Sequence, residues 1–137
     1  MIRKESLSYG NWVYYPNVDN KPARIVSLSC DDIGIETDNC VVFVNRGYIS
    51  PLALSNEILE KNGFVLHDGI YTWRKGEDEL SVNHYGQYTE ISYRLLDISD
   101  VTETDFGCGI TIKNRCAYVH ELQNFITLVG IKKEIVL

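Results

Sequence analysis

The stretch GIYTWRKGEDELSVNHY, residues 69–85, carries the most regular pattern in the chain. Tyr71 and Trp73 alternate with other residues before the turn-forming segment KGEDE, and Leu80 and Val82 alternate after it. Because side chains with a period of two line one face of a β-strand, this spacing predicts two strands joined by a tight turn. The stretch therefore predicts an antiparallel hairpin with one apolar face.

The segments around this hairpin extend it into a sheet. Residues 89–98 (TEISYRLLDI) alternate in the same way, and 109–114 (GITIKN) predict a further short strand. Earlier runs rich in β-branched and aromatic residues predict four more strands: 11–16 (NWVYYP), 23–30 (ARIVSLSC), 33–37 (IGIET) and 41–44 (VVFV). Successive strands with short connections favour an antiparallel meander.

The segment PLALSNEILEKNGF, residues 51–64, changes to the signals of a short helix. Ser55 is a suitable N-cap, because its hydroxyl can accept a hydrogen bond from an amide of the first turn. Gly63 fits the left-handed position after the last turn, and Phe64 can fold back onto the helix in a Schellman motif. We expect a helix over about 55–62 that serves packing.

A second helix is predicted near the end of the chain by an apolar stripe. The stripe has the spacing i, i+4, i+7 and i+11, and it consists of Tyr118, Leu122, Phe125 and Val129. Gly130 fits the position that ends such a helix. We expect a helix over 118–129, followed by a terminal strand in IKKEIVL.

Together these elements predict an α+β fold. We expect a mainly antiparallel, strongly curved β-sheet with two short helices, about 55–62 and 118–129. A length of 137 residues is typical of one domain, so we expect a single domain over 1–137. A domain of this size buries about two thirds of its unfolded surface and needs neither a disulfide nor a metal to fold.

Composition narrows the classes of function. The net charge is −6, and the 13 basic residues are scattered, which argues against general nucleic-acid binding. We find no signal peptide and no apolar run of membrane-helix length, so we expect a soluble protein in the cytoplasm of a host cell and no membrane contact. The four cysteines lack the paired spacing of zinc sites, which favours free thiols, no metal and no cofactor.

The sequence contains none of the common catalytic or phosphate-binding motifs. General acid–base catalysis needs a titratable group with an orienting partner, and no such pairing is evident for the three histidines. Neighbouring strand residues point to opposite faces, so Asp68 is not an automatic partner of His67. We expect a protein that is not an enzyme, and the alternative is a small hydrolase that uses His84 or His120.

Aromatic and polar side chains gather at two places and suggest ligand binding. Aromatic faces can stack on bases, and amides can bond to base edges. The candidate ligand-binding residues are Trp12, Tyr14, His84, Tyr85, Gln87 and Tyr88. The alternative is that tyrosines simply occupy strands, where they are common.

The predicted second helix also has a polar side. His120 lies within reach of Gln123 and Asn124 on one helix face, whereas Glu121 points elsewhere. His120, Gln123 and Asn124 form either a solvent-exposed surface or a contact patch for a partner.

The two helical segments together resemble small proteins encoded by phages and prophage-like elements of Bacteroides-type gut bacteria. The first matching set is Pro51, Leu52, Leu54, Ser55, Glu57, Ile58, Leu59, Gly63 and Phe64, and the second is Tyr118, Val119, His120, Leu122, Gln123, Asn124, Phe125 and Gly130. The chain departs from the pattern at Glu121 and Val129. The resemblance covers about 30 residues. It carries no established activity, so no catalytic residue is transferred.

The resemblance implies a biological origin and a general role for the protein. We expect a non-enzymatic accessory binding protein of phage or prophage origin. It would counter host defence by binding a host protein or by sequestering a nucleotide-like signal. The alternative is a minor virion or assembly protein. A homo-oligomer is compatible with the sequence under any of these functions.

Overall fold

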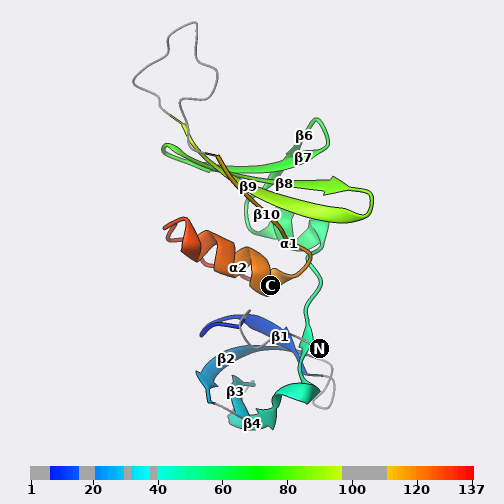
Figure 1. Ribbon diagram of the computed structural model, residues 1–137, viewed down its shortest axis with the longest axis vertical. Coiled ribbons are helices and arrows are strands. Elements are labelled where there is room, and N and C mark those ends of the chain that lie inside the picture. Colours follow the sequence, from blue (N-terminus) through cyan, green and yellow to red (C-terminus); the bar gives the residue numbers. More distant parts are fainter. Residues whose placement is uncertain (1–6, 16–20, 30–31, 38–39, 97–110) are drawn as a thin grey trace, which may run out of the picture. The chain divides into compact units, whose positions relative to one another are not determined.

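The computed structural model describes residues 7–15, 21–29, 32–37, 40–96 and 111–137 (Figure 1). The chain divides into two compact units. Unit 1 consists of Met1–Ala53 and Tyr118–Asn124, and unit 2 consists of Leu54–Ala117 and Phe125–Leu137. The expectation of a single domain over 1–137 stays a prediction.

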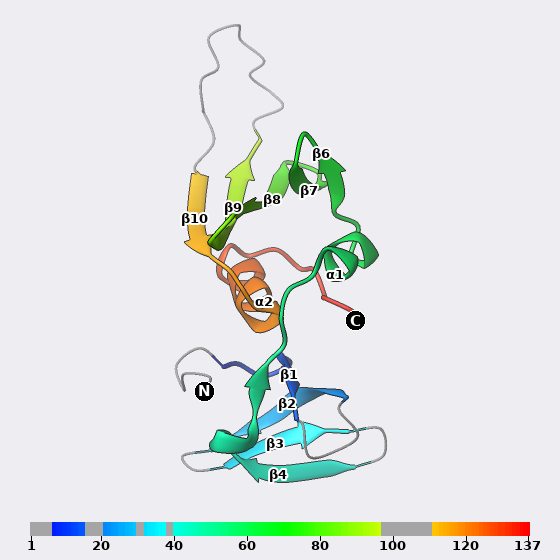
Figure 2. The ribbon, with the colours of Figure 1, turned by 90° about the vertical axis from the view of Figure 1, so that its right-hand side faces the viewer.

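Unit 1 contains a five-stranded antiparallel sheet with the order β4-β3-β2-β1-β5 (Figure 2). Its elements are β1 (Trp12–Tyr14), β2 (Pro22–Leu28), β3 (Asp32–Glu36), β4 (Val41–Asn45), the 3₁₀ helix η2 (Arg46–Tyr48) and β5 (Ser50–Pro51). The first four strands form the predicted meander. The sequence did not predict β5, a two-residue strand that pairs with β1 rather than with its predecessor.

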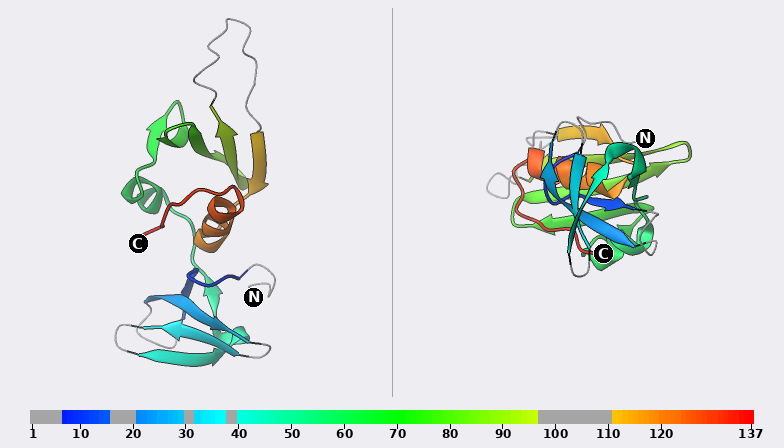
Figure 3. Two further views of the ribbon diagram at one scale, coloured as in Figure 1. Left: turned by 90° about the vertical axis from the view of Figure 1, so that its left-hand side faces the viewer. Right: turned by 90° about the horizontal axis from the view of Figure 1, so that it is seen from below.

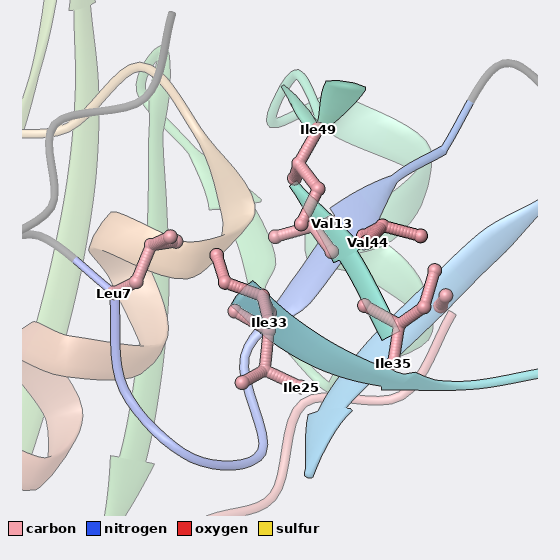
Figure 4. Close-up of a cluster of buried hydrophobic side chains, with 8 residues drawn as sticks. Leu7, Val13, Ile25, Ile33, Ile35, Val44 and Ile49 are labelled. Carbon is pink, nitrogen blue, oxygen red and sulfur yellow. The ribbon is translucent and has the colours of Figure 1, made fainter. Parts of the chain in front are cut away.

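The core of unit 1 is a cluster of aliphatic side chains (Figure 4). It consists of Leu7, Val13, Ala23, Ile25, Ile33, Ile35, Val44 and Ile49. The strict alternation expected over 23–30 is broken by a bulge, because the register passes from Ile25↔Ile35 to Ser27↔Gly34. The extra residue turns Leu28 toward the same cluster as Ile25.

Unit 2 contains a second five-stranded antiparallel sheet with the order β10-β9-β8-β7-β6. Its strands are β6 (Val65–His67), β7 (Ile70–Lys75), β8 (Asp78–Tyr85), β9 (Tyr88–Leu95) and β10 (Thr111–Arg115) (Figure 3). The predicted hairpin and meander are confirmed. Strand β6 was not predicted, and it meets β7 through Asp68 and Gly69, whose φ angles of 51° and 81° match a type I′ hairpin turn.

The helix α1 (Asn56–Lys61) confirms each predicted capping interaction. The Ile58 amide donates to Ser55 Oγ at 3.3 Å. At the other end, the Phe64 amide donates to the Leu59 carbonyl at 3.0 Å, which is the long bond of a Schellman motif. Gly63 has a φ of 85°, which a side chain would disfavour.

The helix α2 (Val119–Leu128) also ends as predicted, because the Ile131 amide donates to the Ile126 carbonyl at 3.1 Å beyond Gly130. Its apolar stripe differs from the expected one at the first turn. Val119 is fully buried, whereas Tyr118 is 38% exposed. The stripe therefore begins one residue later than the spacing predicted, because the helix itself begins at Val119.

The expected terminal strand is wrong, since residues 131–137 form no strand. A side chain holds this segment instead. Asn62 Nδ2 donates to the Val136 carbonyl at 2.7 Å, and the Val136 amide donates to Asn62 Oδ1 at 2.8 Å. Ile135 is buried beside these bonds. One asparagine thus satisfies both backbone groups that a neighbouring strand would have bonded.

The α+β fold class with antiparallel sheets is confirmed. The strands form two open sheets rather than one curved sheet. In unit 2, the buried strand residues Tyr71, Leu80, Val82 and Ile91 all occupy one face by register. Leu59 of α1 and Phe125 and Ile126 of α2 complete the buried set with them.

Candidate functional site

The opposite face of the unit 2 sheet carries mostly polar and charged side chains. We call it the outward face: the even-numbered residues of β7 and β9 and the odd-numbered residues of β8 and β10, which the strand register places on one side. Its central row is Thr72, Ser81 and Ser92. The flanking row Arg74, Glu79 and Arg94 carries longer, charged side chains.

An open pocket of about 680 Å³ lies on this face, over β6, β7 and β8. Its wall combines two aliphatic side chains, two hydroxyls and four ionisable groups. The lining residues are Gly63, Val65, His67, Asp68, Ile70, Thr72, Arg74, Glu79 and Ser81. Hydroxyls both donate and accept hydrogen bonds, and a guanidinium donates several, so the wall suits a polar ligand with one apolar part.

An ion pair orders one side of the pocket. Arg74 Nε donates to Glu79 Oε2 at 2.5 Å. The side chain of Glu79 is only 11% exposed, whereas that of Arg74 is 65% exposed. The carboxylate is therefore held by its cation, and most of the Arg74 side chain is exposed.

A histidine and a carboxylate lie on the other side of the pocket. His67 Nε2 lies 3.5 Å from Asp68 Oδ2. We did not expect these neighbours to meet, because strand neighbours point apart. They meet because Asp68 occupies the left-handed turn position rather than the strand. Both side chains are more than 80% exposed, so water screens the pair strongly.

The structure divides the predicted ligand-binding set between the two units. Trp12 and Tyr14 belong to β1 in unit 1, where the Arg24 guanidinium lies 4.7 Å from the centre of the Trp12 ring system. His84, Tyr85, Gln87 and Tyr88 all belong to the β8–β9 hairpin of unit 2. The relevance of either group to a ligand stays a prediction.

Within the hairpin, the two tyrosines and the histidine face opposite ways. Tyr85 and Tyr88 stack on the outward face with ring centres 5.1 Å apart. The guanidinium of Arg115 lies 4.7 Å from the centre of the Tyr88 ring, a neighbour that sequence spacing did not indicate. His84 lies on the other face, where Nδ1 bonds with Thr89 at 2.8 Å and Nε2 with Asn56 at 3.2 Å.

The polar side of α2 has an internal role in unit 1. Gln123 Nε2 donates to the Gly10 carbonyl at 3.0 Å, and the Trp12 amide donates to Gln123 Oε1 at 2.8 Å. Asn11 Nδ2 donates to Asn124 Oδ1 at 3.0 Å. These bonds account for the two amides without a partner molecule, so the partner contact stays a prediction with no added support.

His120 is buried. Of the two alternatives that the sequence left open for it, the solvent-exposed surface is therefore wrong for this residue. It is 3% exposed, and its ring stacks on that of Tyr118 with centres 5.8 Å apart. Burial holds the pKa of His120 below its ordinary value, because desolvation disfavours the charged imidazolium. The side chain therefore contributes to the folded interior as a neutral ring.

The described residues offer no other centre of reactive groups. Among them, no group of three or more His, Cys, Asp or Glu side chains is placed to hold a metal ion. Cys40 and Cys116 are free thiols, and Cys30 and Cys108 lie outside the described residues. No helix in the described part of the chain is long and apolar enough to cross a bilayer.

Comparisons with known proteins found no match: no family model, no curated protein and no solved structure is significantly similar to the chain. The case for a function therefore depends on the geometry of the outward face.

Proposed function

We propose that the protein is a non-enzymatic binding protein that holds a nucleotide-like ligand on the outward face of unit 2. The observation that carries the proposal is the open pocket of about 680 Å³. This volume lies within the range typical of small-molecule sites. The hydroxyls of Thr72 and Ser81 and the guanidinium of Arg74 supply hydrogen bonds in it, and Ile70 supplies an apolar contact.

The charge of the outward face supports an anionic ligand. Register places four cationic side chains there, namely Arg74, Arg94, Lys113 and Arg115, against the two carboxylates Glu79 and Glu90. Asp68, which also lines the pocket, is a third carboxylate, so these side chains together carry one excess positive charge, although the whole chain carries −6. A local cationic field attracts phosphate groups even when the overall charge repels them.

The aromatic pair supports a ligand with a planar ring. Tyr85 and Tyr88 lie on the same face as the pocket, one row beyond Asn83 and Glu90. Their stacking fixes both rings, and an exposed tyrosine ring face can receive a base. A nucleotide combines both features, since it joins a planar base to a charged phosphate.

The direct test is a ligand screen on the whole chain. We would measure thermal unfolding with mononucleotides, cyclic nucleotides and ADP-ribose derivatives, and confirm any shift by calorimetric titration. A ligand at 100-fold its Kd adds about 2.7 kcal/mol of stability. For a chain of this length, that corresponds to a rise of about 9 °C in Tm. If no member of the panel shifts Tm or releases heat, the nucleotide-binding proposal is wrong.

Substitutions locate the site. Thr72→Val and Ser81→Ala remove one hydroxyl each, and Arg94→Gln removes one cation from the same face. Each should weaken binding by about five- to thirtyfold if it removes one hydrogen bond or contact to a charged ligand. The matched control is Ser50→Ala, which alters a half-buried strand serine of unit 1. Equal affinity in all four variants would place the ligand elsewhere.

One observation favours a second candidate, a small hydrolase. His67 lines the pocket and lies 3.5 Å from Asp68, as a general base with an orienting carboxylate would. The histidines first considered for this role were His84 and His120. His84 makes two internal hydrogen bonds, and His120 is buried. Incubation of bound ligands, followed by mass spectrometry, distinguishes the candidates: turnover that His67→Gln abolishes would establish the hydrolase, and intact ligand would establish the binding protein.

The biological setting remains part of the proposal. A protein that sequesters a nucleotide-like signal fits the accessory role that the resemblance to phage and prophage proteins implies. Binding of a host protein is the other form of the same role. A minor virion or assembly protein has no specific observation in its favour.

A further inference from the structure

Among the described residues, the two sheets have four edge strands, and three of them carry features that discourage pairing with another chain. Strand β5 has two residues and ends in Pro51, and β6 has three residues. Strand β10 presents Lys113 and Arg115, and Asn114 Oδ1 accepts the Arg115 amide at 2.9 Å. Short length, proline and charge are the usual protections of an edge strand.

The fourth edge, β4, has none of these protections. Its sequence VVFVN, Val41–Asn45, contains no charge and no proline over five residues. Phe43 is 66% exposed and Val41 is 49% exposed. An exposed apolar edge of this kind is unusual in a protein that avoids association.

The backbone of β4 has a definite set of outward hydrogen-bonding groups. The Thr37 amide donates to the Cys40 carbonyl at 2.9 Å, which fixes the phase of the antiparallel ladder between β3 and β4. Hydrogen-bonded and non-bonded pairs alternate along such a ladder. Val42 and Val44 therefore bond to β3, whereas the amides and carbonyls of the odd-numbered residues 41, 43 and 45 point away from the sheet.

We infer that β4 is a self-association edge: a second copy of the chain adds its own β4 in antiparallel orientation, with the two-fold axis at Phe43. In this register Phe43 faces its own copy, and Val41 faces Asn45. The three outward-pointing residues of each strand then bond to the three of the other. Interfaces around a two-fold axis must be self-complementary in this way.

The charges of the two strands favour self-pairing of β4 over self-pairing of β10. Pairing of β4 with itself brings no charged side chain against another, because the strand contains none. The same pairing of β10 about its centre would bring Lys113 against Lys113. Like charges directly opposite each other on a sheet are destabilising.

The edge is too small for a tight dimer. A pair of five-residue strands buries less than the roughly 1,200 Å² at the lower limit of stable interfaces. We therefore expect a weak dimer, with a Kd between about 10 μM and 1 mM. Because each copy carries −6, higher salt should tighten the dimer by screening the repulsion between copies.

Sedimentation velocity on the whole chain tests the inference, from roughly 10 μM to 1 mM at physiological and at higher salt. Phe43→Lys places like charges at the two-fold axis and should abolish the dimer. Val41→Pro removes an outward amide without touching the bonds to β3, and should weaken the dimer at least tenfold. The control Leu128→Lys charges an equally exposed apolar residue of α2, 72% exposed, and should leave the dimer unchanged.

Three results would overturn the inference. One is a wild-type chain that stays monomeric at about 1 mM, the upper limit expected for a weak interface. The second is a dimer that persists in Phe43→Lys. The third is a dimer that Phe43→Lys abolishes but Val41→Pro leaves intact, because side-chain contacts would then hold the dimer without strand pairing. Circular dichroism checks the fold of each variant, and Val41→Lys replaces Val41→Pro if the proline variant unfolds. Ligand binding by unit 2 is measured separately, so either proposal can fail alone.

Discussion

Replacing Asn62 with alanine should detach the C-terminal segment from α1. The side chain is 5% exposed and makes three hydrogen bonds: Nδ2 donates to the carbonyls of Ile58 and Val136, both at 2.7 Å, and Oδ1 accepts the Val136 amide at 2.8 Å. Each bond contributes about 1 kcal/mol net. Val136 is 45% exposed, so water partly replaces its lost partners. We therefore expect a loss of about 2 kcal/mol, or about 7 °C in Tm.

Urea denaturation measures this loss, and amide hydrogen exchange locates it. Exchange at the Val136 amide should accelerate in Asn62→Ala before the rest of unit 2 is affected. Asn62→Asp is a sharper variant, because it keeps the acceptor for that amide but turns a carboxylate oxygen toward two carbonyls. It should lose at least as much stability. The control is Asn83→Ala, a half-buried change on β8 that should stay within about 0.5 kcal/mol. A loss below about 0.5 kcal/mol in Asn62→Ala, or unchanged exchange at Val136, would refute the role of Asn62.

Three further changes test unit 1 and α1. Because burial lowers the pKa of His120, the unfolded chain binds its proton first as the pH falls. Wild-type stability relative to His120→Gln should therefore fall below about pH 6.5, by up to roughly 1.4 kcal/mol per pH unit, and the difference between the two should be constant above it; urea titrations at pH 7.5 and 5.5 measure this. Gly34→Ala would place a Cβ 2.9 Å from Ser27 Cβ, so we expect a loss of about 1–3 kcal/mol by denaturation, and a neutral result would contradict the packing. Ser55→Ala removes the acceptor of the Ile58 amide and should lower the free energy of unfolding by about 1 kcal/mol. Ser55→Asp keeps an acceptor at this position and should retain most of that stability.

Local signals in the sequence predicted local structure well. The caps of α1 depend on residues within one helix length, so Ser55 and Gly63 identified both ends. The hairpin of β7 and β8 follows in the same way from alternation around one turn. Long-range choices were not predictable. Alternation shows which face a strand buries but not which strands share a sheet, so the division into two sheets came only from the structure.

The terminal segment shows how a side chain can overrule a pattern. IKKEIVL has the composition of a strand, but its backbone partners come from Asn62, which lies 74 residues earlier. No spacing rule connects an asparagine at the end of a helix with a backbone so distant in sequence. The same limit applies to Gln123, whose bonds to Gly10 and Trp12 give it an internal role that its position on a polar helix face did not reveal.

The candidate site was only partly predictable. The sequence indicated Tyr85 and Tyr88 because aromatic residues stand out in a polar hairpin. It did not indicate Thr72, Ser81 or Arg74, because polar residues at alternate strand positions ordinarily mark a solvated face. They became a candidate site only when register aligned them across two neighbouring strands, β7 and β8, beside a pocket.

The hydrogen bonds from α2 to the start of unit 1 have a consequence for synthesis on the ribosome. The bond between Gly10 and Gln123 joins residues 113 positions apart in the chain. At typical elongation rates of roughly 5–20 residues per second, the N-terminal segment is made about 6–23 s before its helical partner exists. During that interval the first strands of unit 1 must persist without the amides that later fix β1. A nascent chain of this protein is therefore exposed to chaperones, and to neighbouring nascent chains, for seconds with its earliest sheet incomplete.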